Sequence, residues 1–158
     1  MFARLLILIP LLTVLCACAP QASRVYVDKS DRVIVLYDHK NKPMRQYKIA
    51  LGPQPEGHKM MLGDGRTPEG QYLIDWRNPK SRYHKSLHIS YPNEEDVARA
   101  QAMGAQPGHS IMIHGLGDPK TSYRRYGDWT EGCIAVSNRE MNEIWTMVPD
   151  QTPIFIAP

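Results

Sequence analysis

Two residues in the second half of the chain have the side chains needed for nucleophilic catalysis. Cys133 carries a thiol, and His114, 19 residues before it, carries an imidazole. A thiol attacks a carbonyl carbon as the thiolate, and a neighbouring imidazole is a common means of forming a thiolate near neutral pH. We therefore predict that Cys133 is a nucleophile and that His114 is its base. The alternative for Cys133 is a small buried side chain in the core.

Two short apolar runs are expected to position this pair. Residues 111–113 are apolar and end at His114, as in a buried strand that delivers the histidine at its end. A polar loop follows, and residues 130–133 then lead into a second apolar run over 134–136. If these two strands are neighbours in a sheet, His114 and Cys133 lie at neighbouring strand ends and within reach of each other.

Two helices are predicted from their capping signals. Asn93 is a suitable N-cap for the first helix, whose opening turn is acidic and which ends at Gly104. We expect this helix to serve packing. Ser137 and Glu140 have the spacing of a capping box at the start of the second helix. That helix places four apolar side chains on one face: Met141, Ile144, Trp145 and Val148.

The first half of the chain predicts strands. Residues 24–27, 32–37 and 44–51 are runs of β-branched, aromatic or alternating residues separated by turn clusters, and they predict a meander. Residues 52–70 are rich in glycine and proline, lack the G-K-[ST] of a phosphate loop, and lead into a strand over 71–76. We interpret 52–70 as fold-forming turns, with direct substrate contact as the alternative. The predicted fold class is mostly β with two short helices.

His88 is a further candidate site residue. In the run 86–91, Leu87 and Ile89 alternate with His88 and Ser90, so one face of the predicted strand is polar. This face could line a pocket in which His88 binds the substrate. The equal alternative is a structural histidine held by hydrogen bonds.

A zinc site is a competing interpretation of the same side chains. Imidazole and thiolate are suitable ligands for Zn²⁺, and four residues could supply them: His84, His88, His114 and Cys133. The chain contains neither an H-E-x-x-H nor a C-x-x-C ligand pair. We therefore expect neither a metal nor an organic cofactor.

The order of the motifs resembles a known family. His114-Gly115, a loop and then Thr130-Glu131-Gly132-Cys133 are similar to the active-site signature of the L,D-transpeptidase catalytic domain (YkuD) family, in which HG precedes [S/T]-x-G-C. Many members have His in place of Glu131 and Arg in place of Ala135, and these differences match the YafK-like branch. The resemblance implies a β-sandwich or barrel-like catalytic domain over residues 24–158.

The resemblance also implies a mechanism, which is acyl transfer through a thioester of Cys133 with a peptidoglycan stem peptide. In the family a backbone carbonyl orients the imidazole, here that of Gly115, and backbone N–H groups around Gly132 and Cys133 are expected to bind the oxyanion. Thr130 would shape the pocket. Glu131 would have a structural or substrate-binding role, because a carboxylate beside a thiolate tends to raise the pKa of the cysteine.

Three functions are open on this reasoning. If an amine resolves the acyl-enzyme, the chain is an L,D-transpeptidase. If water resolves it, the chain is an L,D-hydrolase or endopeptidase that trims stem peptides or releases peptidoglycan-attached protein. The third function is that of a non-catalytic lipoprotein that binds peptidoglycan, and the presence of both Cys133 and His114 argues against it.

Residues 1–17 predict a lipoprotein signal peptide. Arg4 precedes an apolar run that is too short for a comfortable membrane span. Residues 15–18, Leu-Cys-Ala-Cys, resemble a bacterial lipobox, so that Cys18 becomes the lipidated first residue and 18–23 a short tether. Ala19 then implies sorting to the periplasmic face of the outer membrane. An ordinary secretory signal cut after Ala17 or Ala19 is the alternative.

Cysteine usage and charge bear on compartment and partners. Cys16 would leave with the signal and Cys18 would be lipidated, so Cys133 has no partner for an internal disulfide. The chain carries 19 Lys and Arg against 16 Asp and Glu, and it loses one positive charge with Arg4. This balance is too weak to indicate nucleic-acid binding. The expected partners are stem peptides, the membrane through the lipid anchor and, for the hydrolase, a peptidoglycan-attached lipoprotein.

Overall fold

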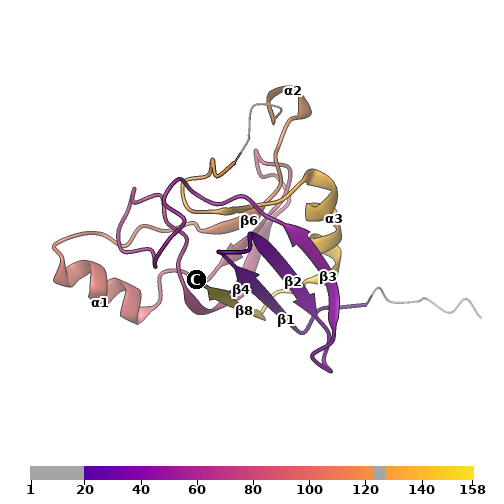
Figure 1. The fold of residues 1–158 in the computed structure, drawn as a ribbon, viewed down its shortest axis with the longest axis horizontal. Coiled ribbons are helices and arrows are strands. Elements are labelled where there is room, and N and C mark those ends of the chain that lie inside the picture. Colours follow the sequence, from indigo (N-terminus) through magenta and orange to yellow (C-terminus); the bar gives the residue numbers. More distant parts are fainter. Residues whose placement is uncertain (1–19, 123–126) are drawn as a thin grey trace, which may run out of the picture.

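One curled sheet of eight strands organises the fold (Figure 1). The computed structural model describes residues 20–122 and 127–158. The strand order is β3-β2-β1-β8-β4-β5-β6-β7. The strands are β1 Arg24–Asp28, β2 Val33–Tyr37, β3 Pro43–Lys48, β4 Gly70–Asn78, β5 Ser86–Ile89, β6 Met112–His114, β7 Ile134–Ala135 and β8 Thr152–Ala157.

A single bridge joins the two ends of this sheet. Ala50, which follows β3, and Ala135 in β7 exchange N–H to C=O hydrogen bonds of 2.9 and 2.8 Å. Because β3 and β7 are the outermost strands, the bridge curls the sheet into a half-barrel. It also fixes the start of β7 against the first half of the chain.

The predicted meander is confirmed in β1, β2 and β3. β1 and β2 pair antiparallel with Val25 opposite Leu36, and β2 and β3 pair antiparallel with Ile34 opposite Tyr47. All four side chains are buried in the core, as expected when alternate residues of a strand face one side.

The last strand, β8, was not among the predicted elements. It lies between β1, to which it is parallel, and β4, to which it is antiparallel. Its burial alternates, with Thr152, Ile154 and Ile156 inside. Pro153 is the second residue of the strand, a position near the strand start where the missing N–H is tolerated. The C-terminus of the chain therefore closes the centre of the sheet.

Both predicted helices are confirmed. α1 (Glu94–Ala102) has Asn93 as N-cap and is followed by Gly104 with a φ of 66°. α3 (Asn138–Met147) begins with the predicted capping box of Ser137 and Glu140. Its predicted apolar face packs into the core through Met141, Ile144 and Val148, with Trp145 partly buried beside them. A third, four-residue helix, α2 (Pro119–Ser122), lies in the loop after β6.

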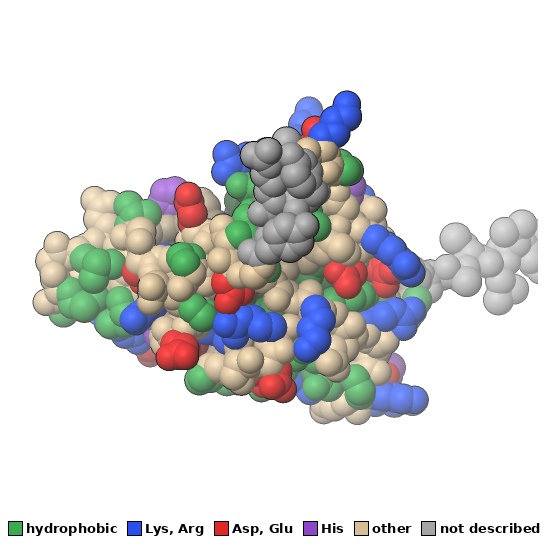
Figure 2. All heavy atoms as spheres, turned by 45° about the horizontal axis from the view of Figure 1, so that its top comes forward, with side chains coloured by type: hydrophobic (Ala, Val, Ile, Leu, Met, Phe, Trp, Pro, Cys, Tyr) green, Lys and Arg blue, Asp and Glu red, His purple; other side chains and the backbone are tan. Residues whose placement is uncertain are grey.

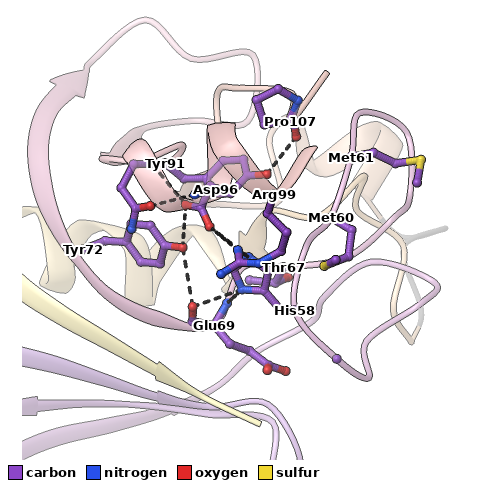
Figure 3. A network of polar contacts seen from close by, with 12 residues as sticks. His58, Met60, Met61, Thr67, Glu69, Tyr72, Tyr91, Asp96, Arg99 and Pro107 are labelled. Carbon is purple, nitrogen blue, oxygen red and sulfur yellow. Dashed lines mark hydrogen bonds and ion pairs between the residues drawn. The ribbon is translucent and has the colours of Figure 1, made fainter. Parts of the chain in front are cut away.

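Buried polar side chains hold the connection between β3 and β4 against α1 (Figure 3). His58 Nε2 lies 2.9 Å from Asp96 Oδ1, and His58 Nδ1 accepts a 3.0 Å hydrogen bond from the backbone N–H of Glu69. The Tyr72 hydroxyl donates to the other oxygen of Asp96 at 2.9 Å. Positive φ angles at Gly63, Gly65 and Gly70 confirm the predicted turns. They do not test the alternative of substrate contact for residues 52–70.

The signal-peptide and lipidation predictions, including those for Cys16 and Cys18, fall on residues outside the described ranges and stay predictions. Within residues 20–122 and 127–158, no helix has the length and apolar character needed to cross a membrane. On the face drawn in Figure 2, Lys and Arg side chains alternate with Asp and Glu and form no single basic patch among the described residues.

Candidate active site

The sheet brings His114 and Cys133 together. β6 and β7 are parallel neighbours, with Ile113 opposite Ile134 and His114 opposite Ala135. Cys133 directly precedes β7, so it lies diagonally across from His114. The prediction of two adjacent strands is confirmed. Both side chains line one cavity of about 360 Å³.

Aromatic rings and one carbonyl fix the imidazole of His114. Its Nδ1 lies 2.7 Å from the Gly115 carbonyl oxygen. A carbonyl only accepts hydrogen bonds, so Nδ1 carries a proton, and in the neutral form of the ring the basic nitrogen is therefore Nε2. The Tyr83 ring stacks on the imidazole at 4.6 Å, and Trp129 meets it edge-on at 5.6 Å. This buried ring is therefore held in one orientation, as the predicted role of His114 as a base requires.

The backbone after His114 is held by the first residue of α3. Asn138 Oδ1 accepts from the N–H groups of Leu116 at 2.8 Å and Gly117 at 3.1 Å, and its Nδ2 donates to the Gly117 carbonyl at 2.7 Å. A Cβ on Gly115 would lie 2.6 Å from Asn138 Oδ1 and 2.9 Å from the Tyr83 carbonyl oxygen. Glycine at position 115 thus allows the close approach that directs its carbonyl to the imidazole.

The environment of Cys133 favours the neutral thiol. Burial raises the pKa of this thiol above its ordinary value, and the negative charge of Glu131 raises it further. A backbone hydrogen bond from Met112, which has the largest effect after burial, lowers this pKa, and so does the positive charge of Lys59. The Sγ atom lies 3.6 Å from the Ser110 carbonyl oxygen. Because the thiol is mostly protonated at neutral pH, its attack on a carbonyl requires a base.

The turn before Cys133 is tied by two threonines. The Thr130 hydroxyl donates to the Cys133 carbonyl at 2.7 Å and accepts from the Gly132 N–H at 3.2 Å. The Thr67 hydroxyl donates to the Gly132 carbonyl at 2.9 Å. Gly132 has a φ of 113°, and a Cβ there would lie 2.4 Å from the Arg66 carbonyl oxygen, so only glycine fits.

This geometry bears on the predicted oxyanion donors. The N–H of Gly132 already donates to Thr130, through a hydrogen bond long enough for a stronger acceptor to replace. The backbone N–H of Cys133 is the second predicted donor. The oxyanion role of both groups stays a prediction.

Two cavities meet at Cys133. The larger has a volume of about 780 Å³ and contains Lys59, Leu62 and Ile111 on its walls. The smaller contains His114 and Tyr83. Both share five lining residues: Ser110, Trp129, Thr130, Glu131 and Cys133. The thiol can therefore be approached from two sides, which suits a reaction with a donor and an acceptor.

The other candidates lie in different places. Glu131 is exposed and lines both cavities, as a substrate-contacting residue would. His88 lines neither cavity; its Nδ1 lies 2.6 Å from Asp75 Oδ1, and its ring stacks on Trp76 at 4.9 Å. These contacts favour the structural alternative for His88. His84 Nε2 contacts Asn142 Oδ1 at 2.8 Å.

The zinc interpretation is not supported by this placement. His84 and His88 are each engaged by a separate partner, and among residues 20–122 and 127–158 no group of three or more His, Cys, Asp or Glu side chains is arranged to hold a metal ion.

Four residues of the site were missed by sequence reasoning. Tyr83 and Trp129 enclose the imidazole, Asn138 holds the backbone beside it, and Lys59 lines the larger cavity. Asn138 lies between the capping-box residues Ser137 and Glu140, and Trp129 lies in the polar loop that follows His114; neither was predicted to belong to the site. No local pattern in the sequence distinguishes Tyr83 or Lys59 from other tyrosines and lysines.

A family model and the curated relatives of this chain indicate the same protein family. The model of the YkuD family, described as the L,D-transpeptidase catalytic domain, matches residues 22–156. A relative named "Putative L,D-transpeptidase YafK", from Escherichia coli strain K12, is 32% identical over 135 residues, which are 80% of this chain and 48% of that protein. The chain thus spans about half the length of the curated relatives it matches.

Solved structures share the fold. The helical cell shape determining protein Pgp2 from Campylobacter jejuni is 24% identical with a TM-score of 0.67, over 87% of this chain and 48% of that chain. An L,D-transpeptidase from Xylanimonas cellulosilytica is 15% identical with a TM-score of 0.59, over 88% and 62%. The expected fold class is confirmed as mostly β, with a curled sheet and two main helices.

Proposed function

The chain belongs to the YkuD family of L,D-transpeptidase catalytic domains, and from this membership we propose that it is an L,D-transpeptidase that acts on peptidoglycan stem peptides through Cys133. The observation that carries the proposal is the meeting of Cys133 and His114 at one cavity, with His114 Nδ1 held by the Gly115 carbonyl. When the imidazole is neutral, this arrangement places its basic nitrogen at Nε2, beside a thiol that needs a base.

In the first half of the proposed reaction, His114 Nε2 takes the Cys133 proton, and Sγ attacks the carbonyl carbon of the third stem residue. The resulting oxyanion is stabilised by backbone N–H groups at Cys133 and Gly132, the latter exchanging its Thr130 partner for the stronger charged acceptor. When the tetrahedral intermediate collapses, the C–N bond breaks. The departing amine of the terminal residue receives the proton from His114, and a thioester of Cys133 is left.

In the second half, an acceptor resolves the thioester. An amine of a second stem peptide gives its proton to His114 Nε2 and attacks the thioester carbonyl, and the Cys133 thiol leaves with that proton. Because two cavities converge on Cys133, donor and acceptor can approach from different sides. If water attacks in place of the amine, the same residues carry out hydrolysis, which trims stem peptides or releases protein attached to peptidoglycan.

We further propose that the chain works as a lipoprotein anchored through Cys18 at the periplasmic face of the outer membrane. Support comes from the lipobox-like residues 15–18 and, for the outer membrane, from Ala19. Incorporation of radiolabelled palmitate into the full chain, with a Cys18→Ala variant as control, tests the anchor. Equal labelling of both proteins would refute it.

The activity is tested with the full chain in mild detergent and purified muropeptides that contain tetrapeptide stems. Intact-protein mass spectrometry should show an acyl adduct on the wild type and none on a Cys133→Ala variant. Cross-linked or amine-exchanged products indicate transpeptidation, and tripeptides or released protein indicate hydrolysis. If wild type and variant behave alike on every such substrate, the non-catalytic binding function replaces this proposal.

A further inference from the structure

Lys59 is a buried cation in the wall of the larger cavity beside Cys133. Its relative exposure is 3%, and it lines the cavity of about 780 Å³. Among the described residues that line this cavity, Lys59 is the one with a positive charge, whereas Asp128 and Glu131 are acidic. Asp128 is already engaged by Arg32 at 2.8 Å and by the Leu51 N–H at 2.8 Å.

The ammonium group of Lys59 is held in place from one side. Its Nζ donates to Asp64 Oδ1 at 2.8 Å and to the Met61 carbonyl at 3.1 Å. An ammonium has three N–H bonds, and no third acceptor is found for it within the described part of the chain. Asp64 is itself fixed by the N–H groups of Met60 and Arg66 at 2.7 and 3.1 Å. Lys59 therefore has one donor available in a position that its neighbours fix.

The segment that carries Lys59 is rigidly supported. The preceding residue, His58, belongs to the network with Asp96 of α1 (Figure 3). The backbone N–H of Leu62 donates to the Gln106 carbonyl at 2.7 Å. The walls near Lys59 also include apolar side chains of Pro53, Leu62 and Ile111. A buried ion pair is weak evidence for a stabilising role, so the Lys59–Asp64 pair at the edge of the cavity is a candidate for a binding role.

We propose that Lys59 anchors a free carboxylate of the donor stem peptide in the larger cavity. This inference rests on the proposed function and names a specificity residue for it. A carboxylate is the group that best matches one available N⁺–H donor, because charge-assisted hydrogen bonds are the strongest in such a site. The carboxylate is either the one at the C-terminus of the peptide or one carried by an internal stem residue. The positive charge of Lys59 also reaches Cys133, whose pKa it lowers.

The test measures binding and needs no turnover. A full-length Cys133→Ala protein is titrated calorimetrically with three synthetic tetrapeptides: one with all carboxylates free, one with a C-terminal amide, and one amidated at its internal carboxylates. The same titrations are done after adding Lys59→Met, Lys59→Gln or, as a charge control, Lys42→Met. Lys42 is an exposed lysine in the turn before β3 and lines neither cavity. Lys59→Gln retains a donor for Asp64 or Met61 should Lys59→Met fail to fold.

The free tetrapeptide is expected to lose about tenfold to hundredfold in affinity with Lys59→Met. One of the two amidated peptides is expected to bind weakly and with the same affinity whether or not Lys59→Met is present. The carboxylate that this peptide lacks is the one that Lys59 binds. Lys42→Met should leave every affinity unchanged. Equal losses on all three peptides, or no binding of any peptide, would overturn the anchor.

Parallel turnover measurements with Cys133 intact separate this inference from the proposed function. Carboxylate-dependent binding without conversion of any donor would refute the reaction and retain the anchor. If the donors are converted and Lys59→Met lowers the turnover of all three tetrapeptides equally, the anchor is refuted and the reaction is retained.

Discussion

Replacement of Gly115 by alanine tests the architecture that holds His114. The new Cβ would lie 2.6 Å from Asn138 Oδ1 and 2.9 Å from the Tyr83 carbonyl oxygen. To restore an ordinary contact of about 3.5 Å, Asn138 must retreat by roughly 1 Å. Its hydrogen bonds to Leu116 and Gly117, now 2.7 to 3.1 Å long, then exceed bonding range.

The expected cost follows from those bonds. Three hydrogen bonds at about 0.5–1.5 kcal/mol each predict that Gly115→Ala lowers the free energy of unfolding by about 1.5–4.5 kcal/mol. Urea denaturation followed by circular dichroism measures this change. Because the Gly115 carbonyl holds the His114 Nδ1 at 2.7 Å, acyl transfer should fall by about 100-fold or more, as expected when a catalytic group is displaced by about 1 Å.

A double-mutant cycle provides the control. Asn138→Ala alone removes the same hydrogen bonds and should cost a similar amount. In Gly115→Ala/Asn138→Ala the contact with Oδ1 no longer exists and the contact with the Tyr83 carbonyl oxygen remains, so Gly115→Ala should cost less in the Asn138→Ala background than in the wild type. This account of Gly115 is refuted if Gly115→Ala has the same free energy of unfolding as the wild type. It is also refuted if the losses of the two single variants add strictly in the double variant.

Three further perturbations test the surroundings of the pair. Glu131→Gln should lower the pKa of Cys133, because the Glu131 charge raises it, and the pH profile of iodoacetamide alkylation should move to lower pH; an unchanged or upward shift would contradict the electrostatic assignment. Tyr83→Ala should reduce kcat/KM by about two- to tenfold through loss of the stack on His114, whereas Tyr83→Phe should retain it, so equal losses in both variants would show that the ring itself is not responsible. Ser137→Ala should lower the free energy of unfolding by about 1 kcal/mol by removing the N-cap of α3, and thermal unfolding at an unchanged temperature would argue against that contribution.

The sequence by itself determined the local structure of this protein. The N-cap at Asn93, the capping box at Ser137, the alternation in β1 to β3 and the apolar face of α3 all depend on residues a few positions apart, and all are found in the structure. The order of His114-Gly115 and the Thr-x-Gly-Cys element likewise sufficed to indicate the family, which the match over residues 22–156 shows.

Only the tertiary structure decided which side chains surround the reactive pair. Tyr83 reaches His114, Lys59 shares a cavity with Cys133, and Asp128 binds the Leu51 N–H across 77 residues of sequence. The position of β8 in the middle of the sheet is equally non-local, since its partners β1 and β4 lie far away in the chain. The preference of a segment for helix or strand depends on residues within one or two helical turns or a few strand residues. The contacts around the reactive pair depend instead on strand order and register in the sheet, which are fixed only when the whole chain folds.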